Sequence, residues 1–240
     1  MTAKFIHVVI LCTLLGCLSA CKSRSPGNMR NIRPYYYPIE HLEDGMMFVY
    51  KYRDDLLPPA LWHLRFSTEA GAQYLYFTEL DDSLTVKQTI KERIFPSGSK
   101  IVAYTITERD STGHRQTAQM QILSGDVFPF WVEDNGGVYI FEAKWFFPHE
   151  PEVKYTLVRN RRYSGDTTFV FKGRKIPAVK FSVKELVETE INGSQELTFD
   201  LMEVYAKGLG LVASERRLND SLALAFVLTD TIRGQLMLPH

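Results

Sequence analysis

The thiols of this chain are confined to its beginning. Cys12, Cys17 and Cys21 are its three cysteines, and small residues stand before the last two, Gly16 before Cys17 and Ala20 before Cys21. A thiol can form a disulfide, bind a metal or act as a nucleophile. Beyond residue 21 this chemistry is absent, so a domain built from the rest of the chain must be held together by its core alone.

The residues around these cysteines have the composition of an export signal. Lys4 is followed by an apolar run over residues 5–15, which is too short to span a membrane stably. The motif Leu18-Ser19-Ala20-Cys21 resembles the lipobox of bacterial lipoproteins. The resemblance implies cleavage before Cys21 and attachment of a diacylglycerol thioether and an N-acyl chain to it. Cys17 is the alternative acceptor, and a plain signal peptide with incidental cysteines is the alternative interpretation.

This site sets the expected boundaries and location. We expect a signal peptide over residues 1–20, a flexible tether over 21–34, because the residues after Cys21 are polar and form turns, and a single β-rich domain over 35–240. Several acyl chains together hold a protein on a membrane far more firmly than one. Lys22, which is not an aspartate, favours the outer membrane by resemblance to the enterobacterial sorting rule. An acidic cluster after the anchor is the usual mark of surface export in Bacteroidota lipoproteins, so by resemblance to them its absence favours the periplasmic face over the cell surface.

Charge and the remaining reactive residues argue against several functions. The 28 basic and 28 acidic side chains balance without blocks of either sign, which predicts no binding of nucleic acid. The histidines are scattered, and no G-x-S-x-G elbow is present. An acid–base pair of carboxylates on different strands would leave no spacing to find. We therefore expect no metal, no cofactor beyond the acyl groups and no catalytic residue, with an envelope hydrolase as a distant third hypothesis.

Clustered aromatic residues are the candidate binding residues. Tyr35, Tyr36 and Tyr37 follow the expected tether, and Trp131 and Trp145 lie in two further clusters. Such side chains bury a large area at low entropic cost, so they are frequent in partner-binding surfaces and ligand pockets. Packing in the core is the alternative for all five. The tyrosine triplet is the stronger candidate because core packing is least required next to a tether.

Strands are the elements that must position these residues. From residue 35 onward, short runs rich in Val, Ile, Thr, Tyr and Phe alternate with Gly, Pro, Asn and Asp. The clearest case places Val179, Phe181 and Val183 on one face of a strand. The pattern predicts strands at residues 47–52, 73–78, 100–108, 116–123, 138–142, 154–158, 167–171, 178–183, 196–201 and 221–232.

Turn-forming residues separate these runs. Asn135-Gly136 and Asn192-Gly193 fit type I′ hairpins, and residues 96–98 and 111–113 fit two other tight turns. Residues 84–95 have apolar side chains at helical spacing as well as strand spacing, so a helix is the alternative there. Together these signals predict an all-β fold with few short helices. It is either a strongly curved antiparallel sheet, in the manner of a half-open barrel, or a two-sheet sandwich.

The most distinctive motif is Tyr-Ala-Lys-Gly-Leu-Gly-Leu-Val at residues 205–212. Too few residues follow it for a dinucleotide-binding fold. We expect Gly208 and Gly210 to allow a turn or bulge where a neighbouring strand or aromatic ring lies close. With Lys-Gly-Arg-Lys at 172–175, residues 159–212 resemble the C-terminal half of β-rich Bacteroidota envelope lipoproteins, which look distantly like the half-open barrels of lipoprotein carriers.

These observations predict a membrane-anchored envelope protein without catalytic activity, which binds another envelope protein or supports an envelope assembly. The resemblance to carriers leaves a second hypothesis, in which an apolar concavity of the sheet holds a lipid or lipoprotein. A carrier needs apolar side chains around an enclosed cavity, whereas a partner-binding protein needs them on an exposed patch.

Overall fold

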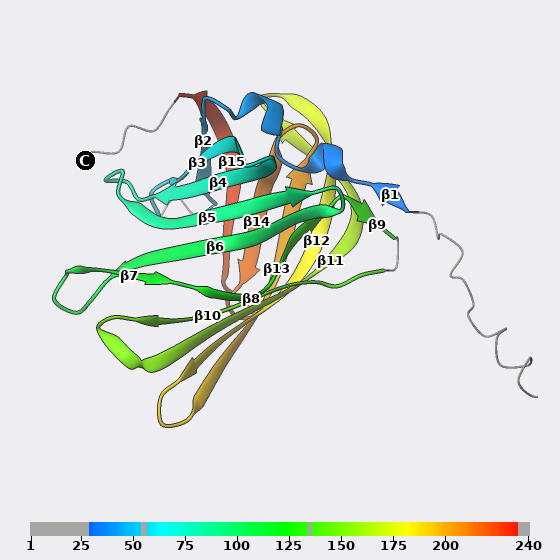
Figure 1. Ribbon diagram of the computed structural model, residues 1–240. Coiled ribbons are helices and arrows are strands. Elements are labelled where there is room, and N and C mark those ends of the chain that lie inside the picture. Colours follow the sequence, from blue (N-terminus) through cyan, green and yellow to red (C-terminus); the bar gives the residue numbers. More distant parts are fainter. Residues whose placement is uncertain (1–28, 54–56, 134–135, 235–240) are drawn as a thin grey trace, which may run out of the picture.

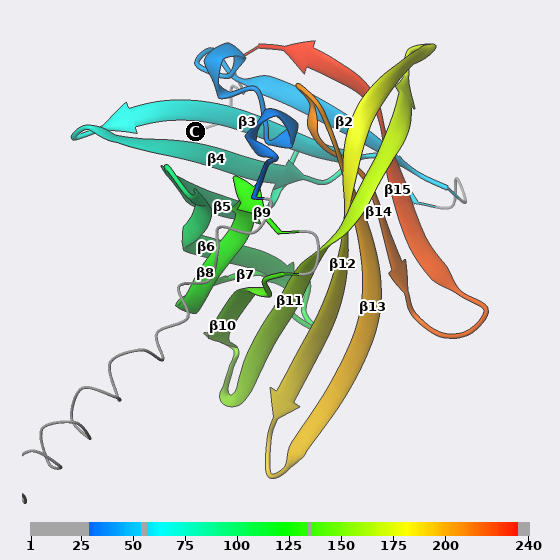
Figure 2. The same cartoon turned by 90° about the vertical axis from the view of Figure 1, so that its right-hand side faces the viewer.

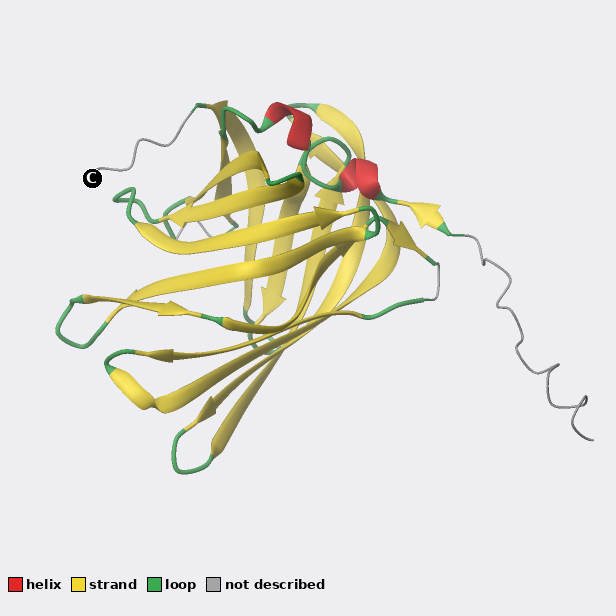
Figure 3. Cartoon of the chain, viewed as in Figure 1, coloured by secondary structure: helices red, strands yellow, loops and turns green. Residues whose placement is uncertain are grey.

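The computed structural model describes residues 29–53, 57–133 and 136–234, which are almost entirely strand (Figure 3). The expected signal peptide, Cys17, Cys21 and Asn135 of one predicted turn lie outside these residues. The elements are β1 (Arg30–Asn31), η2 (Arg33–Tyr35), η3 (Ile39–His41), β2 (Met46–Tyr52), β3 (Ala60–Glu69), β4 (Ala72–Leu80), β5 (Val86–Phe95), β6 (Gly98–Arg109), β7 (Arg115–Gln119), β8 (Gln121–Pro129), β9 (Trp131–Val132), β10 (Tyr139–Phe147), β11 (Glu150–Phe171), β12 (Arg174–Glu190), β13 (Ser194–Ala206), β14 (Gly210–Arg217) and β15 (Ala223–Arg233). Of these, η2 and η3 are short 3₁₀ helices.

Thirteen strands form one antiparallel sheet that closes on itself. Successive strands pair from β2 to β6 and from β10 to β15, β15 pairs with β2, and β8 joins β10 to β6. The β5–β6 pairing completes a ring of strands, with β7 attached to β6 at its side (Figures 1 and 2). The predicted all-β fold with a strongly curved antiparallel sheet is confirmed, and the sheet is closed and not half-open.

The ring has a covered end and an opposite end. The segment containing η2 and η3 lies across one end (Figure 1), where Ile32, Tyr36 and Leu42 are buried in the main core. The opposite end, which we call the mouth, carries the turns β4–β5, β6–β7, β12–β13 and β14–β15. The N-terminal segment therefore acts as a plug of the covered end.

Residues 30–34 belong to the folded part, although we expected them in the tether. β1 pairs with β9, and Ile32 is fully buried. The backbone N–H of Gly208 donates to the carbonyl oxygen of Pro34 at 2.9 Å. The burial of an apolar side chain and these backbone hydrogen bonds fix the segment against the sheet.

The glycine motif of residues 205–212 forms the β13–β14 turn at the covered end. Gly210 has a φ of +80°, and a Cβ placed on it would lie 2.2 Å from Cδ1 of Tyr37. Tyr37 is itself held edge-on against Phe48 and Phe77. At Gly208, by contrast, a Cβ would meet no atom within 4 Å and only its φ of +74° favours glycine. The close approach of an aromatic ring, predicted from the motif, is confirmed at Gly210.

Some strands differ from the prediction. Residues 154–158 and 167–171 are parts of the single strand β11, because Gly165 introduces a bulge that bends the strand without ending it. Residues 84–95 contain the strand β5 and no helix, whereas residues 116–123 are divided between β7 and β8. β3 and β14 were not predicted, because apolar residues on both faces, as at the start of β3, obscure the period of two.

Candidate functional site

The interior of the ring contains a cavity of about 310 Å³ lined by strands on all sides. Most of its wall is apolar and includes Trp62, Phe141 and Phe226. The wall also carries a group of charged residues that we call the arginine network. Its members are Arg159 and Arg161 of β11, Glu185 of β12, Glu203 of β13 and Arg216 of β14.

Arg161 and Glu203 form a buried two-point ion pair, each residue being 3% exposed. Nε of Arg161 donates to Oε2 of Glu203 at 2.9 Å, and Nη2 donates to Oε1 at 3.1 Å. Nη1 donates to the carbonyl oxygen of Val127 at 2.5 Å, and the hydroxyl of Tyr205 donates to Glu203 at 3.2 Å. These contacts satisfy both charged groups, which is the condition under which a buried ion pair is tolerated.

The charge of each partner in this pair shifts the pKa of the other. Burial alone would raise the pKa of the Glu203 carboxyl, but the nearby positive charges of Arg161 and Arg159 outweigh burial and lower that pKa. Burial disfavours the charged form of Arg161, but Glu203 raises the pKa of its guanidinium. Both groups are therefore charged at neutral pH, and the cavity wall holds permanent charge.

Arg159 and Arg216 extend the ion pair around Glu185. Nη2 of Arg159 donates to Glu203 at 3.1 Å, and its Nε lies 3.0 Å from Oε2 of Glu185. Nη2 of Arg216 lies 2.8 Å from Oε1 of Glu185, and its guanidinium stacks over the ring of Phe199 at 3.9 Å. Among the described residues, the buried Nε atoms of Arg159 and Arg216 make no well-aligned hydrogen bond.

Another buried carboxylate, that of Glu92, lies near the plug. The hydroxyl of Tyr36 donates to its Oε2 at 2.7 Å. Burial raises the pKa of the Glu92 carboxyl, an effect that Tyr36 and the more distant charge of Arg161 only partly oppose. Tyr36 thus uses its polar atom inside the protein, with its ring among the aromatic residues of the core.

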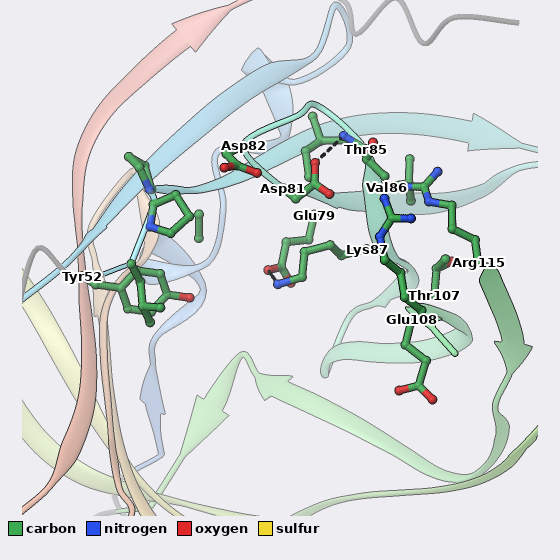
Figure 4. A pocket seen from close by; sticks show the side chains of 16 residues that line it. Tyr52, Glu79, Asp81, Asp82, Thr85, Val86, Lys87, Thr107, Glu108 and Arg115 are labelled. Atoms are coloured by element: carbon green, nitrogen blue, oxygen red, sulfur yellow. Dashed lines mark hydrogen bonds and ion pairs between the residues drawn. The ribbon is translucent and has the colours of Figure 1, made fainter. Parts of the chain in front are cut away.

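A second pocket, of about 390 Å³, lies at the mouth beside the β4–β5 turn, and we call it the rim pocket (Figure 4). Here Lys87 donates to Glu79 at 3.3 Å. Glu79 also accepts a hydrogen bond from Gln88, which in turn accepts one from Tyr104. Because Gln88 and Tyr104 line the interior cavity, this polar chain connects the mouth with the cavity. Burial raises the pKa of Tyr104 to about 12, so its hydroxyl remains a neutral donor.

The predicted binding residues are not brought together. Tyr36 and Tyr37 are buried in the core, and Tyr35 is packed at its edge. Trp145 is buried and stacks on Tyr155, whereas Trp131 of β9 is 44% exposed. None of the five predicted residues lines the interior cavity. Core packing, the alternative considered for all five, describes Tyr36, Tyr37 and Trp145.

The charged residues of the cavity were absent from the predicted site. One signal for them was present, since Glu185 follows Val179, Phe181 and Val183 at the same period of two. A carboxylate that continues an apolar face is unusual unless a partner meets it inside the fold. That partner comes from β11 and β14, far away in the sequence.

Two further features of the described residues bear on function. Over residues 29–53, 57–133 and 136–234, no group of three or more His, Cys, Asp or Glu is arranged to hold a metal ion. In these same segments no helix is both long enough and apolar enough to cross a bilayer.

The fold resembles two solved structures. One is a predicted lipoprotein from Parabacteroides distasonis, with a TM-score of 0.52 and 11% identity over 82% of this chain and 98% of the other. The second is a predicted exported protein with a YmcC-like fold from Bacteroides fragilis, with a TM-score of 0.50 and 11% identity over 82% and 99%. No family model and no curated protein matches the chain. At this identity the likeness shows the fold.

Proposed function

We propose that this chain is a lipid-anchored envelope protein that holds a small lipid-like molecule inside its ring of strands and performs no catalysis. The observation that carries the proposal is the interior cavity, with mainly apolar walls and one group of converging polar side chains. Ligand sites typically combine these features in pockets of about 300–1,000 Å³. The cavity favours the carrier hypothesis, modified because its wall is charged on one side.

The location is part of the proposal. It is supported by the resemblance of residues 18–21 to a lipobox, and the two solved structures of this fold are described as a lipoprotein and an exported protein of related bacteria. We propose acylation of Cys21 and attachment to the outer membrane facing the periplasm.

Filling the cavity tests the proposal. Ser214 lines it, so Ser214→Phe is expected to abolish ligand retention because the ring occupies the space. Ser182→Phe is the matched control, since Ser182 is exposed on the outside of β12. Native mass spectrometry of the exported chain carrying Cys21→Ser should show a stoichiometric small-molecule adduct. The adduct should be lost in Ser214→Phe and kept in Ser182→Phe. If the protein without a cavity substitution carries no small-molecule adduct, the proposal is contradicted.

The binding of another envelope protein is a second candidate function, favoured by a free strand edge. β13 extends past its neighbour β14, because their pairing begins at Asp200 and Arg217. The edge over residues 194–199 includes Leu197, which is 60% exposed. Unpaired edges of this kind accept an extended segment of a partner.

A photoreactive residue at position 197 tests this candidate in intact cells. We expect an adduct of one defined mass at Leu197. None is expected at Val227, which is also exposed but paired with β14 and β2. Equal crosslinking at the two positions, or none at Leu197, would argue against strand addition.

A further inference from the structure

We propose that the ligand of the interior cavity is a single-chain amphiphile with one anionic headgroup, carboxylate or phosphate, which the arginine network binds. This inference rests on the proposed function and names the class of ligand. It depends on the charge of the cavity wall, the unused donors of the arginines and the apolar character of the remaining wall.

The charges in the cavity wall are unbalanced. Three guanidinium groups, those of Arg159, Arg161 and Arg216, share two carboxylates, those of Glu185 and Glu203. A buried charge without a counterion is costly. An anion in the cavity would complete the balance.

The remaining acidic groups nearby have other partners. Glu92 is not among the residues that line the cavity; Tyr36 donates to it, and burial raises the pKa of its carboxyl. Glu79 at the rim pairs with Lys87. The excess positive charge therefore belongs to the cavity side of the network.

The arginine network also has N–H groups without a hydrogen-bond partner in the described part of the protein. Among the described residues, Arg216 pairs with Glu185 through Nη2 alone, at 2.8 Å, which leaves the N–H groups of its Nη1 without a partner. The oxygen atoms of a carboxylate or phosphate would accept hydrogen bonds from such groups. Stacking on Phe199 holds the guanidinium of Arg216 in place, so the site is organised before a ligand arrives.

The rest of the wall fits an alkyl chain. Ile90, Ile101, Val127, Leu157 and Leu224 line it together with the aromatic residues. A cavity of about 310 Å³ lies at the lower end of the range for ligand pockets. This size favours one short chain over a two-chain phospholipid.

Isothermal titration calorimetry with matched ten-carbon ligands tests the inference on the exported chain carrying Cys21→Ser. Decanoate and decyl phosphate should bind about tenfold or more tightly than decanol, since charge-assisted hydrogen bonds are lost with the neutral alcohol. Decylammonium should bind more weakly than decanol. Inorganic phosphate, which has the headgroup without the chain, should not bind measurably.

Two substitutions test whether Arg216 supplies the positive charge that binds the headgroup. Arg216→Met retains an apolar stem but removes the guanidinium, so the preference for decanoate over decanol should fall about tenfold. Arg217→Met is the matched control, because Arg217 is the next residue of β14 and is exposed on its outer face. Should Arg216→Met fail to fold, the ligand series on the unsubstituted protein decides alone.

The outcomes separate the two proposals. Equal binding of decanoate and decanol, or tighter binding of decylammonium, would overturn the anionic headgroup and leave a cavity that binds apolar chains. Tight binding of inorganic phosphate alone would overturn the amphiphile. Binding of none of these ligands would overturn this inference together with the proposed function.

Discussion

Gly210→Ala should destabilise the protein by about 3 kcal/mol or more. The substitution forces alanine into a left-handed backbone conformation, which costs about 1 kcal/mol. It also places a Cβ 2.2 Å from the ring of Tyr37. That ring cannot easily move, because Phe48 and Phe77 hold it from other sides. Overpacking of this kind costs about 2 kcal/mol.

Gly208→Ala separates the two contributions. Gly208 has nearly the same φ, but a methyl group there would meet nothing within 4 Å. Urea denaturation should therefore show a loss of only about 1 kcal/mol for this variant. Equal losses for the two variants would mean that Tyr37 yields to the new methyl group and that the plug is not firmly seated.

Glu203→Gln is expected to cost about 3–5 kcal/mol of unfolding free energy at neutral pH. The substitution keeps the shape of the side chain but leaves the buried guanidinium of Arg161 without its carboxylate. Breaking one partner of a buried ion pair is more damaging than removing both. Asp200→Asn is the control on the same strand. Asp200 lies 4.0 Å from Lys184 with both side chains largely exposed, so its loss should be within about 0.5 kcal/mol.

The effect of Glu203→Gln should depend on pH in a defined direction. The pKa of Glu203 is lowered in the folded state, so its contribution is fully present above the unfolded pKa of about 4.3. It is lost as pH falls through the lower folded value. Denaturation at pH 7 and at successively lower pH should show the gap between wild type and Glu203→Gln narrowing only below about pH 4. A gap that widens on acidification would contradict the ionised pair.

Local patterns in the sequence were enough to predict much of the fold. Alternation at Val179, Phe181 and Val183 predicts a strand with one buried face, and all three residues are buried. Asn192, with a φ of +50°, and Gly193 lie in the β12–β13 turn at the predicted place, but Glu190 pairs with Ser194, so the loop is longer than the predicted two-residue type I′ turn. Closure of the sheet could not be predicted from such local patterns. It depends on β15 pairing with β2 and on β8 joining β10 to β6, and no turn residue specifies these non-local pairings.

The site was harder to predict than the fold. Arg159 and Arg161 occupy inward positions of β11 after Tyr155 and Leu157, in a stretch where Arg162 is also charged but faces outward. Composition does not distinguish these arginines, because the sequence separates each from its carboxylate. The interpretation of the tyrosine triplet depended on the tether, which the sequence predicts to continue to residue 34. With Ile32 buried, the tyrosines belong to the core.

The plug has a consequence for how the molecule would stand on a membrane. The described chain begins at Met29, next to β1, and β1 adjoins the covered end of the ring (Figure 1). An anchor at Cys21 would therefore place the blind end toward the bilayer and direct the mouth into the aqueous space. A ligand would then enter from solution or from a second protein, and not by lateral transfer out of the lipid to which the chain is attached.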